Sequence, residues 1–236
     1  WIKSPPQTNE VRRCAPLIAT GHWLAGQFEL PFMVSELGAS AGLNLNWDQF
    51  ALETDAGRLG PTNAPVTLNP VWTGSIPAHK ELAVADRRGV DLNPLDSKKP
   101  DHTLRLLAYL WPDQPHRHAL TRAAIAAHDA QVDQGDAIDW LENRLLAIPN
   151  GHVHLIYHTI AWQYFPSEVA KRGAELIEAE GERATRDNPL AWLSMESDGN
   201  SDGAALTLRL WPGNQTFHLG RVDFHGRWVR WDGPVR

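Results

Sequence analysis

A glycine-rich segment with one carboxylate, residues 36–42 (Glu-Leu-Gly-Ala-Ser-Ala-Gly), combines residue types that could bind a nucleotide-like cofactor. Glycines let a ligand approach the backbone, and the start of a following helix adds partial positive charge. The spacing acid-x-Gly-x-x-x-Gly differs from the Gly-x-Gly-x-x-Gly dinucleotide fingerprint, and the Glu36 carboxylate would repel a pyrophosphate. The segment therefore favours a cofactor with a cationic or amine group, although a turn needed only for helix–strand packing is the alternative. The residues predicted to contact the cofactor here are Glu36, Gly38, Ser40 and Gly42.

A second carboxylate, Asp91, lies at the predicted end of a strand over residues 82–91 and is followed by Leu92. An acid at the tip of such a strand can bind both ribose hydroxyls of a nucleoside. Alternatively, Asp91 forms the turn before Asn93. The glycine segment and this acid resemble the first two motifs of S-adenosylmethionine-dependent methyltransferases. The gap between them is longer than is usual in that family, and a Pro- and Gly-rich stretch over residues 51–80 accounts for the excess.

A third acid, Asp136, precedes Ala137 after a short predicted strand over residues 131–136. The resemblance to methyltransferases implies that Asp136 and Ala137 contact the adenine of the cofactor. The alternative is that Asp136 caps a helix predicted over residues 137–148. Ligands of open α/β sheets bind at the carboxyl ends of the strands. Because the three motifs follow in the expected order, each at such an end, they predict an S-adenosylmethionine pocket.

Residues 158–164 follow the next predicted strand and offer groups for the reaction itself. His158 could be a general base that deprotonates a hydroxyl or amine of the substrate, and Tyr164 is the second catalytic candidate. Alternatively, His158 is hydrogen-bonded to the cofactor or to the backbone. The Asn-Pro-Pro-Tyr motif is absent, which argues against nucleobase N-methylation. A rival chemistry is zinc-dependent hydrolysis, because His152, His154 and His158 alternate along the strand and could share a metal with a carboxylate.

Polar and aromatic side chains near these motifs could form the substrate site. The polar cluster over residues 7–10 is either a helix cap or a lid over the pocket. Eleven tryptophans are many for 236 residues and suggest at least one aromatic-walled pocket. The residues predicted to contact substrate are Asn9, Glu10, Trp47, Trp162 and Gln163.

The elements that must position these groups alternate between strand and helix. Helical periodicity separates the apolar runs until about residue 195, after which two strands follow with no helix between them. This order predicts a single α/β domain over residues 1–236 with a Rossmann-like, mostly parallel seven-stranded sheet, helices on both faces and a C-terminal antiparallel hairpin. A helical segment over residues 1–30 and an insertion or flap over residues 51–80 complete the prediction.

Composition narrows the classes of partner. The net charge is −6 and the pI is near 6.0, so no broad nucleic-acid footprint is expected. A single cysteine rules out an intrachain disulfide and is typical of the cytoplasm. No apolar run approaches the roughly 18–20 residues of a membrane helix, so no membrane partner is expected. The sequence makes no prediction about the oligomeric state.

Six segments carry a resemblance to a known family, namely residues 7–10, 36–45, 89–96, 106–114, 162–164 and 208–212. Through these segments nearly the whole chain is similar to a bacterial family catalogued as domain of unknown function 2332. The resemblance implies a Rossmann-like methyltransferase fold and no established activity. The leading hypothesis is a methyltransferase that acts on a small molecule. A non-catalytic ligand-binding or scaffold protein is the alternative, and a metal-dependent hydrolase is the third.

Overall fold

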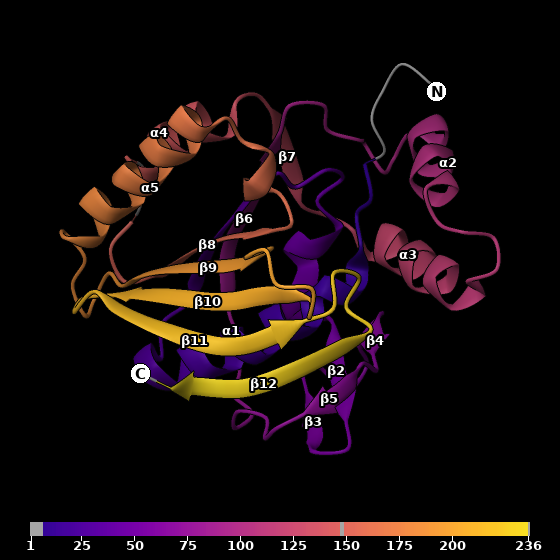
Figure 1. Cartoon of the computed structure of the whole chain (residues 1–236), viewed down its shortest axis with the longest axis horizontal. Coiled ribbons are helices and arrows are strands. Elements are labelled where there is room, and N and C mark those ends of the chain that lie inside the picture. Colours follow the sequence, from indigo (N-terminus) through magenta and orange to yellow (C-terminus); the bar gives the residue numbers. More distant parts are fainter. Residues whose placement is uncertain (1–6, 147–148, 236) are drawn as a thin grey trace.

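A nine-stranded sheet forms the centre of the computed structural model, which describes residues 7–146 and 149–235 (Figure 1). The strand order is β5-β12-β11-β10-β9-β8-β1-β6-β7. The nine strands are β1 (Phe32–Leu37), β5 (Val71–Thr73), β6 (Val84–Asp91), β7 (Gln131–Gln134), β8 (Val153–Thr159), β9 (Leu190–Glu196), β10 (Ala204–Trp211), β11 (Gln215–Val222) and β12 (Trp228–Val235).

The five strands from β7 to β9 are mutually parallel. Every residue of β1 and β8 is buried, as expected for central parallel strands covered on both faces. The register places Glu36 beside Gly89 of β6 and Tyr157 of β8. The carboxyl ends of these strands therefore bring the predicted motifs to one edge of the sheet.

The other side of the sheet differs from the prediction of seven strands and a C-terminal hairpin. β9, β10, β11 and β12 form a continuous antiparallel meander. The last part of the chain, where the second strand of the predicted hairpin was expected, holds both β11 and β12, separated by a turn in which the Asp223 carboxylate accepts from the backbone N–H groups of His225 and Arg227. β5, from the Pro- and Gly-rich stretch, adds a ninth strand parallel to β12. The fold is thus α/β with a larger and more mixed sheet than predicted.

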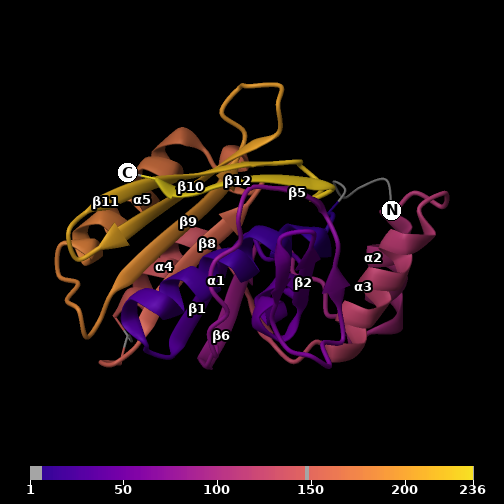
Figure 2. The same cartoon turned by 90° about the horizontal axis from the view of Figure 1, so that it is seen from below.

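Helices cover both faces of the sheet (Figures 1 and 2). α1 (Cys14–Phe28) packs in the larger core on one face, and α4 (Ala137–Leu145) and α5 (Ser167–Gly181) pack on the other. α2 (Pro100–Ala108) and α3 (Pro115–Ala127) contact each other to one side of the sheet. Both of these helices begin at a proline, whose fixed φ suits the first helical position. No helix within the described ranges is long and apolar enough to cross a membrane.

The predicted insertion is folded against α1. β2 (Ala51–Thr54), β3 (Gly57–Leu59) and β4 (Thr67–Leu68) form a separate small sheet. Its leucines lie in the larger core, and the two ring nitrogens of His22 in α1 lie 3.2 and 3.0 Å from the backbone nitrogens of Gly60 and Lys80, one of which donates to the ring. Three short 3-10 helices complete the described part of the fold, namely η1 (Val11–Arg13), η2 (Leu43–Gln49) and η3 (Trp162–Tyr164). Residues 1–6 of the predicted N-terminal helical segment and residues 147–148 of the predicted helix over 137–148 lie outside the described residues.

Candidate functional site

The glycine loop, residues 38–42, connects the end of β1 to η2. Gly38, Ser40 and Gly42 all have left-handed φ values, of +73°, +54° and +74°. A side chain at position 38 would meet Ala161, because a Cβ atom built there lies 2.6 Å from the Ala161 Cβ. Gly38 is therefore required both by the backbone turn and by close contact with the chain that leaves β8.

Most backbone N–H groups of the glycine loop have partners within the protein. Ser40 N–H donates to Asp91 Oδ2 at 2.8 Å, and Ala41 and Leu43 N–H donate to Asn9 Oδ1 at 3.2 and 3.0 Å. The Ser40 hydroxyl is buried without a hydrogen-bond partner. Because the amides point at protein oxygens, the loop does not offer the free donors that a phosphate group requires.

Asp91 lies at the end of β6 and is shared between the glycine loop and its own turn. Besides Ser40, Asp91 accepts from the Asn93 N–H at 2.9 Å and from the Gln7 side-chain amide at 2.8 Å. The turn interpretation of Asp91 is thus present, together with a contact to the loop of the first motif. Leu92, the next residue, exposes 65% of its surface at this edge.

Glu36 is a buried carboxyl group with few hydrogen bonds. It is 2% exposed, and the Tyr157 hydroxyl donates to Glu36 Oε2 at 3.3 Å. Burial raises the pKa of Glu36 to about 8; the Tyr157 hydrogen bond and the charge of Arg13 oppose the shift, and the charge of Asp91 adds to it. Near neutral pH, Glu36 therefore holds a proton.

Residues 7–13, here called the N-terminal strap, connect several loops at the carboxyl edge. The buried Glu10 forms ion pairs with Arg12 and with the buried Arg117 of α3. Arg13 donates to the backbone carbonyls of Thr159 and Phe224. Burial lowers the pKa of Arg13, against the attraction of nearby carboxylates. Of the predicted substrate residues, Asn9 thus lies against the glycine loop and Glu10 against Arg117 of α3, both as fixed parts of the fold.

His158 lies in a buried network at the ends of β8 and β9. Trp192 Nε1–H donates to His158 Nε2 at 3.0 Å, and indole nitrogen only donates, so the proton of the neutral ring is on Nδ1. His158 Nδ1 lies 2.7 Å from the Glu196 carboxylate, which also accepts from the N–H groups of Ala161 and Trp162. Both ring nitrogens are occupied. This geometry favours the structural interpretation of His158 over the general-base interpretation.

Glu196 was not predicted from the sequence, although an acid at the carboxyl end of a strand was the signal that singled out Asp91. Burial raises the pKa of Glu196, but the hydrogen bond from His158 and the backbone N–H groups of Ala161 and Trp162 outweigh it and lower the pKa. The other groups that sequence reasoning missed are Gln7 as a partner of Asp91, Arg13 and Tyr157.

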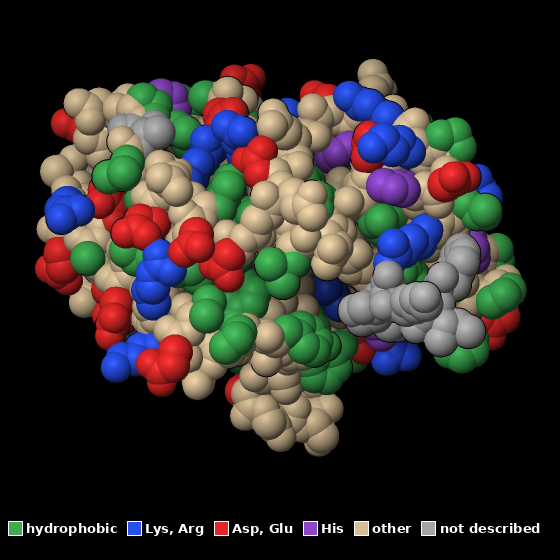
Figure 3. Space-filling view, turned by 90° about the horizontal axis from the view of Figure 1, so that it is seen from above, with side chains coloured by type: hydrophobic (Ala, Val, Ile, Leu, Met, Phe, Trp, Pro, Cys, Tyr) green, Lys and Arg blue, Asp and Glu red, His purple; other side chains and the backbone are tan. Residues whose placement is uncertain are grey.

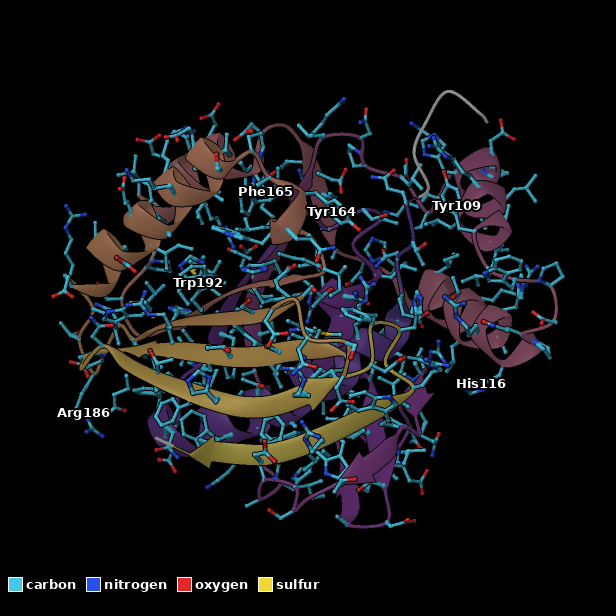
Figure 4. All side chains as sticks on the ribbon, in the orientation of Figure 1. Tyr109, His116, Tyr164, Phe165, Arg186 and Trp192 are labelled. Carbon is cyan, nitrogen blue, oxygen red and sulfur yellow. The ribbon has the colours of Figure 1, made fainter. Side chains whose placement is uncertain are left out.

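The predicted aromatic and amide groups after β8 divide between the interior and the surface. Trp162 is half-buried and stacks on His158, with ring centroids 4.8 Å apart. Gln163 is exposed, and Tyr164 exposes 74% of its surface. Figure 4 shows Tyr164 and Phe165 near each other above the sheet, with Trp192 toward α5. Of this group, Gln163 and Tyr164 are the most accessible to a substrate.

Two other predicted residues occupy structural positions. Trp47 is fully buried and packs edge-on against Phe32, and a Cβ built at Gly21 would lie 2.3 Å from its ring. The prediction of Trp47 as a substrate wall is therefore wrong, because the ring fills the core under α1. Asp136 accepts from the N–H groups of Ile138 and Asp139 and caps α4, as the capping alternative predicts, with Ala137 buried behind it.

The three histidines considered for zinc do not meet. His152 contacts the backbone oxygen of Asn150, His154 contacts the Ser35 hydroxyl at 2.8 Å, and His158 lies in the network with Glu196. Within the part of the chain that the structure describes, no group of three or more His, Cys, Asp or Glu side chains could hold a metal ion. The arrangement offers no support for the hydrolase hypothesis.

The surface is hollowed between the part that carries α4 and α5 and the part that carries α2 and α3, and hydrophobic side chains gather beside this hollow (Figure 3). Two cavities, of about 310 and about 530 Å³, are lined by other parts of the chain. The smaller lies at the amino ends of β6 and β7, and the larger lies beside β5 and β12. Neither cavity includes Asp91 or a residue of the glycine loop.

Comparison with known proteins identifies a family and no activity. No curated protein and no solved structure matches the chain significantly. A model of a family described as an uncharacterized protein conserved in bacteria (DUF2332) matches residues 1–231. Because the match spans almost the entire chain, this protein belongs to the bacterial DUF2332 family, which confirms the family resemblance of its sequence.

Proposed function

We propose that the protein is an S-adenosylmethionine-dependent methyltransferase that acts on a small molecule. One observation carries the proposal: two carboxyl groups, Glu36 and Asp91, end neighbouring parallel strands on either side of a left-handed glycine loop, and Asp91 is bonded to that loop. This edge of a parallel sheet is where α/β proteins bind nucleotide ligands. A cofactor with an amine at one end and a ribose diol at the other suits two carboxyl groups better than a pyrophosphate does.

The residues at the edge fit such a cofactor in part. Asp91 would accept from the ribose hydroxyls, and Glu36 would lie toward the cationic methionine end, where a positive group favours the ionised carboxylate. The Ser40 hydroxyl is a buried polar group that lacks a partner, as expected beside a ligand site. The exposed Leu92 offers an apolar surface for a base. When bound, the cofactor supplies an electrophilic methyl group on a sulfonium.

The chain itself would contribute position rather than acid–base chemistry. His158 has no free ring nitrogen, so it would hold the Trp162 side of the site in place through Glu196. The exposed Gln163 and Tyr164 are the groups that remain free to touch an acceptor. Orientation of two reactants can supply about 7–11 kcal/mol of a reaction barrier, so positioning is a sufficient role for these residues.

A non-catalytic ligand-binding or scaffold protein is the second candidate. The specific observation in its favour is that the loop amides are bonded to Asn9 and Asp91 while His158 is fully occupied. These groups therefore do not need a ligand to complete their hydrogen bonds. This candidate predicts that cofactor binding, if present, occurs without product.

Equilibrium dialysis with methyl-labelled S-adenosylmethionine, followed by a screen of small acceptors for label transfer, tests both candidates. The proposal predicts retention of label and its transfer to at least one acceptor. Retention without transfer in a broad screen favours the second candidate. If the folded, ligand-free protein retains no label, the proposal of an S-adenosylmethionine-dependent enzyme is wrong.

A further inference from the structure

Gln7, the first residue of the N-terminal strap, contacts Asp91, the carboxylate to which the proposed function assigns the ribose. Gln7 Nε2 donates to Asp91 Oδ1 at 2.8 Å and to the Asn93 carbonyl at 3.1 Å. A ribose hydroxyl that donates to Asp91 Oδ1 would compete with this contact. The Gln7 amide therefore donates, from within the chain, to an oxygen that the proposed function assigns to the ligand.

The N-terminal strap contains a residue that a ligand could displace, Gln7, and two residues that are held in place, Asn9 and Glu10. Asn9 and Glu10 are 7% and 3% exposed, and they are tied to the glycine loop and to Arg117. Gln7 is only partly buried, and its contact with Asn93 is exposed to solvent. Displacement of Gln7 can occur by rotation of the backbone at residues 7 and 8, because the buried contacts that anchor the described part of the strap are those of residues 9, 10 and 13.

We propose that Gln7 is an intramolecular latch that competes with ligand hydroxyl groups for Asp91. This inference rests on the proposed function, since it takes Asp91 to be a ligand contact. When the latch opens, the Gln7 amide leaves Asp91, and one or two hydroxyl groups of the ligand donate to the same carboxylate. No covalent bond forms or breaks. The latch keeps Asp91 hydrogen-bonded when no ligand is bound, and a ligand must displace it.

The fraction of molecules in which the latch is closed determines how much it weakens ligand binding. The apparent dissociation constant equals the intrinsic constant divided by the fraction of molecules in which Gln7 is away from Asp91. A hydrogen bond to a charged group is stronger than one between neutral groups, and the partial exposure of this one weakens it. We expect a latch closed in roughly nine molecules of ten, so removal of the Gln7 amide tightens ligand binding about tenfold.

Calorimetric titration with S-adenosylhomocysteine compares the wild type with Gln7→Ala. Gln131→Ala is the matched control, because the side-chain amide of the exposed Gln131 also donates to an aspartate, Asp133, at 3.0 Å. The latch predicts a Kd about tenfold lower for Gln7→Ala and an unchanged Kd for Gln131→Ala. An unchanged Kd for Gln7→Ala overturns the proposal, and so does a weaker one, because Gln7 would then contact the ligand.

A ligand-free measurement separates failure of the latch from failure of the proposed function. Backbone ¹⁵N relaxation of positions 7 and 9 reports order on the nanosecond timescale. The latch predicts that position 7 is ordered in the wild type and becomes flexible in Gln7→Ala, with order parameters below about 0.6, while Asn9 stays rigid. If S-adenosylhomocysteine binds neither protein, the proposed function is wrong. If position 7 is equally ordered in the wild type and in Gln7→Ala, the latch is wrong, whatever the titration shows.

Discussion

Glu36 and Glu196 are both largely buried carboxyl groups at the carboxyl edge of the same parallel sheet, yet their pKa values move in opposite directions. Burial dominates for Glu36, whose single side-chain hydrogen bond comes from Tyr157, and the pKa rises to about 8. Glu196 accepts from His158 and from backbone N–H groups, which overcome burial and lower its pKa. The number of donors, rather than burial, decides which carboxyl is charged.

The carboxyl edge of the sheet therefore contains two different regions, one around Glu196 and one around Glu36. The Glu196 region is a network in which each group has its partner, and it holds the Trp162 segment in place. The Glu36 region contains a protonated carboxyl, an unpartnered Ser40 hydroxyl and a partly exposed latch on Asp91. Groups whose hydrogen bonding is incomplete are the ones that a ligand can complete, so the second region is the better candidate for binding.

The largest expected effect concerns the proton on Glu36. Its native pKa of about 8 lies above the unfolded value of 4.5, so the native state holds the extra proton between these pH values, and stability falls as pH rises through that window. Glu36→Gln removes the dependence. Over about 3.5 pH units at about 1.4 kcal/mol each, the variant should gain up to roughly 5 kcal/mol relative to wild type at pH 8 and almost nothing at pH 4.

Urea unfolding at several pH values measures this difference. Glu81→Gln is the control, because Glu81 is exposed and should give parallel curves for variant and wild type. A difference between Glu36→Gln and wild type that does not grow with pH would contradict the assignment of a protonated Glu36.

Glu196 should show the opposite behaviour. Glu196→Ala leaves His158 and the N–H groups of Ala161 and Trp162 without their acceptor, and we expect a loss of about 3 kcal/mol. Glu196→Gln keeps one acceptor oxygen and should lose less. Because the native pKa is lowered, the stability that Glu196 contributes is present above its unfolded pKa and is lost as pH falls. Equal unfolding midpoints for wild type and Glu196→Ala at pH 7 would refute the network.

A smaller effect is expected at the contact between the two regions. Gly38→Ala places a Cβ 2.6 Å from the Ala161 Cβ at a φ of +73°, and a loss of roughly 2–3 kcal/mol is expected. Gly199→Ala is a matched control, since its φ is +83° but no atom lies within 4 Å of the added Cβ. Its cost should be about 1 kcal/mol, from backbone strain alone. If the two variants unfold at the same temperature, Ala161 moves aside without loss of stability, and the predicted effect of the contact is wrong.

The smallest effect is expected at Asp136, where capping and adenine contact can be separated. Asparagine caps a helix about as well as aspartate, so Asp136→Asn should change stability by less than about 0.5 kcal/mol, and Asp136→Ala by about 1 kcal/mol. If Asp136 only caps α4, neither variant alters the Kd of S-adenosylhomocysteine. A tenfold weaker Kd for the folded Asp136→Asn protein would instead establish the adenine contact.

Local patterns predicted the elements that hold the site. The apolar run of β1, the glycines that follow it and the acid after β6 lie where the sequence placed them, because burial and turn formation are local requirements. The antiparallel half was less predictable. The strand break at Asp223 depends on side-chain hydrogen bonds in the turn, and the addition of β5 depends on pairing with residues 157 positions away.

Site residues that depend on tertiary contacts were missed for the same reason. A tryptophan does not reveal by its type whether it lines a pocket or fills a core, and Trp47 proved to be core. Gln7 and Glu196 act through partners 84 and 38 positions away. Their roles follow only from the three-dimensional arrangement of the carboxyl edge.

The proposed ligand site depends on Asp91 in the Glu36 region. Isothermal titration of the folded protein with S-adenosylhomocysteine, in wild type and in Asp91→Asn, tests this directly, with thermal unfolding to verify that both proteins are folded. We predict saturable binding to the wild type and at least tenfold weaker binding to Asp91→Asn. No heat with ligand-free wild type, or equal affinity of the two proteins, would contradict it.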